Sequence, residues 1–256
     1  MVFKSILAKA GMGSAQVDTI LQISMATPGS ILSGEVVIKG GQVPQKINGV
    51  ELYLESVVER EAHDREDRVK VTLGSLRIAN SGEIGVEAVV RFPFTLKIPL
   101  ECPINVLFGH EIRTIPVSLR TCLDISAGKD SGDFDPIWIS PNAAQQFVLD
   151  TFLKMGMHLK STDLEYGRAG SSRLPCYQEI EFYPGSAFSH IREVELTFVG
   201  HPEYLEVIIE SDKKRRGMAA FMHGGSFDDI QLLRIPYHSF HSVDVESQIR
   251  RILNGY

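Results

Sequence analysis

LDISAGKDSGDFDPIWISPN, residues 123–142, is the stretch that decides how this chain is organised. It is acidic, it is punctuated by glycine and proline, and it lies near the midpoint of the 256 residues. On either side the sequence breaks into short runs in which apolar and polar residues alternate, which is typical of half-buried strands. The pattern predicts two β domains of similar size, residues 1–125 and 140–256, joined by an acidic linker over 126–139.

The first half is predicted to be an antiparallel β-sandwich. Residues 28–41 combine a Pro-Gly turn, a strand and a glycine turn, and alternating strands follow over 47–58, 68–73 and 90–98. Pro93 should confine the last of these to a sheet edge or a strand end, because proline donates no ladder hydrogen bond. Strands at these spacings without helices between them favour a sandwich over an α/β fold.

The second half is predicted to hold one or two helices among further strands. A helical stripe near 142–156 follows Ser140, which is a suitable cap, and Pro141, which the first turn tolerates. Gly156 should end this helix. The tail, 245–253, is amphipathic and could form a second one.

A short N-terminal helix is also expected. Phe3, Ile6, Leu7 and Ala10 fall on one face at helical spacing. Two interpretations remain open, namely a helix docked on its own domain and a helix lying on a membrane surface.

Two charged segments are candidates for turns. Mixed charges over 59–67 predict a solvated hairpin tip. Lys213, Lys214, Arg215 and Arg216 form a basic cluster, which could contact an acidic partner or anionic lipid, or could simply be a second solvated tip.

Composition narrows the classes of function. The net charge of −6 has the wrong sign for a general nucleic-acid binder, and no apolar run approaches the ~20 residues that cross a bilayer. Cys102, Cys122 and Cys176 lie far apart without a CxxC pair, which predicts buried, inert thiols in a reducing cytoplasm.

Catalytic and cofactor motifs are not expected. The sequence has no G-x-S-x-G nucleophile elbow, no G-x-G-x-x-G and no P-loop. His238 and His241, with Asp244 and Glu246 close by, leave a metal-dependent hydrolase open as an alternative, although hydrogen-bonded histidines are the simpler interpretation.

Several segments resemble one known family. PGSILSGEVVIKGG (28–41) is similar to the opening strand of arrestin-like domains, and residues 123–141 are similar to the inter-domain passage of the bacterial sporulation-control proteins, the stage-zero sporulation protein M family. The agreement continues in order through VLDTFLKMG (148–156) to EVIIESDKKRRG (206–217). The resemblance implies two tandem arrestin-like β-sandwiches, a cytoplasmic location and a regulatory role through protein contacts.

Ionic contacts beside the linker could hold two sandwiches at one angle. The candidates are Arg113 and Arg120 as cations, with Asp124, Asp133 and Asp135 as their partners. A solvated linker is the alternative, in which such pairs contribute under ~1 kcal/mol.

The sequence therefore predicts a mostly β, non-enzymatic cytoplasmic adaptor that contacts other proteins and needs no cofactor, metal or nucleic acid. Two copies of the chain could also self-associate by pairing exposed sheet edges. A peripheral membrane protein is the first alternative, and a metal-dependent hydrolase is the second.

Overall fold

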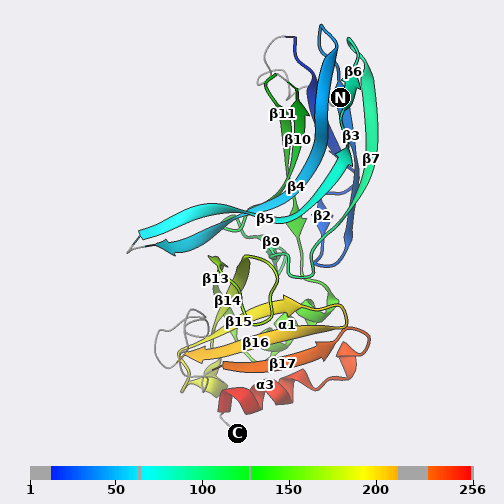
Figure 1. Cartoon of the computed structure of the whole chain (residues 1–256). Coiled ribbons are helices and arrows are strands. Elements are labelled where there is room, and N and C mark those ends of the chain that lie inside the picture. Colours follow the sequence, from blue (N-terminus) through cyan, green and yellow to red (C-terminus); the bar gives the residue numbers. More distant parts are fainter. Residues whose placement is uncertain (1–12, 63–64, 127, 213–229, 255–256) are drawn as a thin grey trace.

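A computed structural model describes residues 13–62, 65–126, 128–212 and 230–254. The chain is mostly β, with an elongated first domain set above a second domain (Figure 1). The predicted N-terminal helix and the basic cluster lie outside the described residues.

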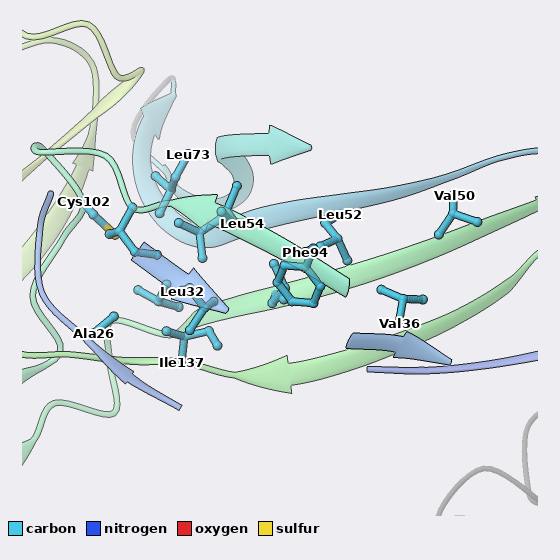
Figure 2. Close-up of a cluster of buried hydrophobic side chains, with 14 of the residues drawn as sticks. Ala26, Leu32, Val36, Val50, Leu52, Leu54, Leu73, Phe94, Cys102 and Ile137 are labelled. Atoms are coloured by element: carbon cyan, nitrogen blue, oxygen red, sulfur yellow. The ribbon is translucent and has the colours of Figure 1, made fainter. Parts of the chain in front are cut away.

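The first domain is built from two facing sheets. One has the order β1-β3-β7, and the other begins β11-β10-β4, with β5 and β6 also paired to β4. Apolar side chains from both sheets, including Leu32, Leu52 and Phe94, point at one another between them (Figure 2). The strands of this domain are β1 (Gln16–Leu21), β2 (Met25–Ala26), β3 (Ile31–Lys39), β4 (Gln45–Ala62), β5 (Arg65–Ala79), β6 (Gly82–Ile84), β7 (Val89–Lys97), β8 (Val106–Leu107), β9 (His110–Glu111), β10 (Val117–Ile125), β11 (Ser131–Pro136) and β12 (Trp138–Ile139).

Pro93 lies in an edge strand, a position that proline tolerates. It sits within β7, which is the terminal strand of the three-stranded sheet and pairs with β3. The predicted edge position is confirmed, because an edge strand tolerates a residue that cannot donate to a ladder.

The second domain is one antiparallel sheet covered by helices. Its strands follow one another in chain order, and the buried faces of α1 and α3 pack on the same side of the sheet in a common apolar cluster. In place of the second sheet expected of a sandwich, the described residues of this half supply two helices. The elements are α1 (Ala143–Lys154), β13 (His158–Tyr166), β14 (Cys176–Tyr183), β15 (Glu193–Gly200), β16 (Tyr204–Asp212), β17 (Ile230–Pro236) and α3 (Val245–Asn254), with 3-10 turns at Ser186–Phe188 and Phe240–Ser242.

The cap of α1 is Asn142, not Ser140 as predicted. The Asn142 side chain accepts hydrogen bonds from the backbone N–H groups of Ala144 and Gln145, and the Gln145 side chain accepts one from the Asn142 N–H. This reciprocal capping box satisfies amides that the helix itself leaves without partners. Gly156 follows the helix with a φ of 84°, as predicted for its end.

Replacing Asn142 with alanine should lower the free energy of unfolding by about 1 kcal/mol, because the first turn of α1 loses its side-chain acceptor. Asn142→Ser keeps an acceptor oxygen and should cost less. Urea denaturation of both variants measures the difference, and equal losses would contradict the capping role.

The predicted linker, 126–139, is not a free linker. Residues 131–136 form β11, which pairs with β10, and Trp138–Ile139 form β12, which pairs in parallel with β2. Ile137 and Ile139 are fully buried. The segment is therefore the edge of the first domain, and the second domain begins directly after it.

The hairpin β4–β5 extends far beyond the sandwich. It bends away from the first domain and reaches over the second (Figure 1). Its strands stay paired as far as Ala62 and Arg65, so most of the predicted tip over 59–67 is regular strand. Glu59 of β4 pairs in parallel with Glu165 of β13, and this contact joins both domains into one ten-stranded sheet.

Candidate functional site

The junction between the domains is a buried apolar interface. The inner face of the hairpin packs in the same cluster as side chains of β13, β14 and the loop before β14, so apolar contact continues from one domain into the other. Each such side chain contributes roughly 1.5–3 kcal/mol when fully buried, which makes the two domains costly to separate. The junction members are Val58, Val71, Leu73, Cys102, Leu164, Leu174 and Cys176.

Glu101 ties the loop after β7 to the second domain. Its Oε2 accepts hydrogen bonds from the Ser172 hydroxyl at 2.6 Å, the Arg173 N–H at 2.8 Å and the Leu174 N–H at 3.3 Å. A carboxylate that accepts from several donors forms strong, directional contacts. This loop is therefore fixed against the second domain.

Two amide side chains complete the junction. Gln178 on β14 accepts from the Ile104 N–H and donates to the Ile104 carbonyl, both at 2.8 Å. Buried Asn105 donates to the carbonyl of Ile137 at 3.0 Å and accepts from the N–H of Ile139 at 2.6 Å. The loop thus binds both the second domain and the strand that leads into it.

A small pocket at the junction is lined in part by thiols of low reactivity. Cys102, Cys176 and Tyr177 are among the residues that line it. Burial, with a smaller effect from Glu101, raises the pKa of Cys176 to about 12, and burial also raises the pKa of Cys102. Thiols held in the protonated form are poor nucleophiles.

Arg120 does not bind the predicted aspartates. It pairs with Glu55 at 3.0 Å and lies 4.4 Å from the centre of the Tyr53 ring, while Lys70 approaches Glu55 from the other side at 3.1 Å. Burial opposes ionisation of Glu55, but hydrogen bonds from Arg120 and Lys70 outweigh it and lower the pKa of this carboxyl.

The remaining predicted ionic residues are also placed differently. Asp124 accepts from the Asn48 amide at 2.8 Å, and Arg113 is exposed between β9 and β10. The reason is strand alternation: Arg120 points to the outer face of the sheet, whereas Asp133 and Asp135 point inward. The predicted pairs across the junction are therefore replaced by contacts within the first domain.

The outer side of the same edge segment carries apolar residues, which we call the outward stripe: exposed Phe134, Pro136 and Met25 with half-buried Trp138. Phe134 is 59% exposed, and Met25, 57% exposed, lies directly opposite Trp138 in the β2–β12 pair. Phe134 is the cross-strand neighbour of Arg120. The alternation in DFDPIW could have identified this stripe from the sequence.

Three of the residues considered for metal binding, His241, Asp244 and Glu246, make other contacts. His241 packs against the rings of Phe147 and Phe240, Asp244 accepts from the Ser247 N–H at 3.0 Å, and Glu246 pairs with Lys154 and Arg250. Over the described ranges, no three or more histidine, cysteine or acidic side chains are grouped as metal ligands. Within those same ranges, no helix has the length and apolar character to cross a bilayer.

Comparison with known proteins identifies the family. The family model described as SpoOM protein matches residues 3–215 of this chain. The chain belongs to the SpoOM family. The sporulation-control protein spo0M of Bacillus subtilis strain 168 is 33% identical over 259 residues, which cover 99% of this chain and 98% of that protein.

A solved structure extends the likeness to the SpoOM fold. The crystal structure of Spo0M from Bacillus subtilis has a TM-score of 0.84 and 30% identity, and the match covers 96% of this chain and all of that one. The family resemblance seen in the sequence is confirmed, and so is the mostly β fold.

Proposed function

We propose that this SpoOM-family chain is a non-enzymatic regulatory protein that acts by binding other proteins. The observation that carries the proposal is the outward stripe, an exposed apolar surface on the strand that connects the domains. The Bacillus subtilis relative is named a sporulation-control protein, which supports a regulatory role. The protonated thiols of the junction pocket favour a structural role for that pocket over a catalytic one.

The composition of the stripe suits a protein interface. Aromatic residues, methionine and arginine are enriched in interface cores, and tryptophan, tyrosine and arginine dominate binding hot spots. Phe134 lies on β11, which pairs with β10, and Trp138 lies on β12, which pairs with β2. Arg120, the cross-strand neighbour of Phe134, stacks on Tyr53. A preordered surface loses little conformational freedom on binding, which favours affinity.

Phe134→Ser should lower recovery of a specific protein partner by about tenfold or more, because an aromatic hot spot is worth at least ~2 kcal/mol. The measurement is quantitative affinity capture with the whole chain as bait. Leu232→Ser is the matched control, since Leu232 is an apolar residue 50% exposed on the other domain. Equal recovery with both variants would place the binding surface elsewhere.

The cytoplasm is the compartment that suits this proposal. Cys102, Cys122 and Cys176 are all free thiols, as a reducing compartment maintains them. Self-association by sheet-edge pairing stays a prediction. The membrane alternative rests on segments outside the described residues, and liposome sedimentation of the whole chain tests it.

A further inference from the structure

The inner side of the edge segment carries a carboxylate cluster, formed by half-buried Asp133 and Asp135 on β11 and buried Asp18 on β1. Asp133 Oδ2 accepts a hydrogen bond from the Thr19 N–H at 2.7 Å, which closes the seam between the edge strands of the two sheets. Asp18 is only 8% exposed. Asp18 and Asp135 each have one buried carboxylate oxygen without a hydrogen-bond partner among the described residues.

Among the residues that the structure describes, the charged neighbours that act on Asp135 are acidic. On β10, Leu119 lies opposite Asp135 and Thr121 lies opposite Asp133, and both are fully buried. The charged groups that act on Asp135 are Asp133 on its own strand and Asp18 on β1. Three negative charges in this partly buried seam repel one another, since water screens them less than it does at an open surface.

We propose that Asp18, Asp133 and Asp135 form a proton-sensitive latch on this seam. The latch is closed when Asp135 carries a proton and donates it in a hydrogen bond to Asp133. It loosens when that proton passes to solvent and all three groups are charged.

The direction of the response follows from the electrostatics. Burial first, and then the charges of Asp133 and Asp18, raises the pKa of Asp135 to about 7. Burial and Asp133 also raise the pKa of Asp18. Because the folded pKa of Asp135 lies above its ordinary value of 3.8, its contribution to stability is full at low pH and is lost as pH rises through about 7.

The latch is connected through β11 to the domain junction and to the outward stripe. β11 continues into β12, whose backbone is bound by Asn105 at the junction. The outward stripe occupies the opposite side of the same strand. Proton loss near neutral pH therefore loosens the strand that presents the stripe, and this holds whether or not the stripe binds a protein.

The test uses the single tryptophan of the chain, Trp138, which is three residues from Asp135. We expect its fluorescence to change between about pH 5 and 9 with a midpoint near 7. Asp135→Asn should remove this transition, and Asp18→Asn should move its midpoint to lower pH. Glu83→Gln, at an exposed carboxylate on β6, should leave it unchanged.

Two results would overturn the latch. One is a wild-type signal that is flat over this range, and the other is a transition that survives in folded Asp135→Asn. Circular dichroism shows whether Asp135→Asn folds. If it does not fold, the pH midpoint of the Trp138 fluorescence in Asp18→Asn is the deciding measurement: an unmoved midpoint refutes the proposal, and a lowered midpoint supports it.

Discussion

Leu164→Ala should lower the free energy of unfolding by about 3 kcal/mol and release the two domains from one another. Leu164 is 3% exposed on β13 and belongs to the same apolar cluster as Val58 and Val71 of the hairpin. Truncation removes buried methyl groups and leaves a cavity at the contact that joins the domains. Urea denaturation measures the loss, and small-angle X-ray scattering measures the expected rise in radius of gyration.

Leu196→Ala is the matched control for this prediction. Leu196 is fully buried in the core of the second domain, away from the hairpin cluster. It should cost a similar free energy while leaving the scattering curve of the folded protein unchanged. If Leu164→Ala also leaves the curve unchanged, the apolar junction does not hold the domains together.

Arg120→Met should lower the free energy of unfolding by about 2 kcal/mol, because it leaves the buried Glu55 carboxylate with Lys70 alone. Glu55 is 3% exposed, whereas Arg120 is about one-third exposed, so the loss is smaller than for a fully buried pair. The pKa of Glu55 lies below its ordinary value of 4.5. Its stabilisation is therefore present above that ordinary value and is lost as pH falls through the lowered pKa.

A double-mutant cycle isolates this interaction. Glu55→Gln and Arg120→Met should be strongly non-additive, because each removes the same contact. Arg77→Met, at an exposed pair with Glu51, should cost less than ~0.5 kcal/mol. Additive losses at Glu55 and Arg120 would show that their contact is not a significant source of stability.

The sequence predicted the individual strands better than their partners. Alternation identified the strands that became β3 and β4, and Pro93 placed β7 at an edge. The edge strand β11 was missed, because glycine, proline and aspartate in residues 131–136 imitate a linker while the alternation of inward and outward side chains persists. For this segment the composition indicated a linker and the side-chain alternation indicated a strand, and the alternation was correct.

The ionic contacts could not be predicted from position in the chain. Arg120 and Asp133 lie on neighbouring strands, yet a register shift of one residue decides which face each side chain occupies. Glu55 is 65 residues from Arg120 and has no local signal that marks it as the partner. The same holds for Glu101 and Gln178, whose contacts depend on how the two domains are docked.

The most direct test replaces Phe134 with the photoreactive residue benzoylphenylalanine in the whole chain. The variant is expressed in the organism from which the sequence comes, and the living cells are irradiated. We expect a discrete adduct with another protein, absent when the same probe replaces Leu232. That result would establish the outward stripe as a surface that other proteins contact. Equal labelling at both positions, or no protein adduct at Phe134, would contradict the proposal that this SpoOM-family chain regulates by binding other proteins through the stripe.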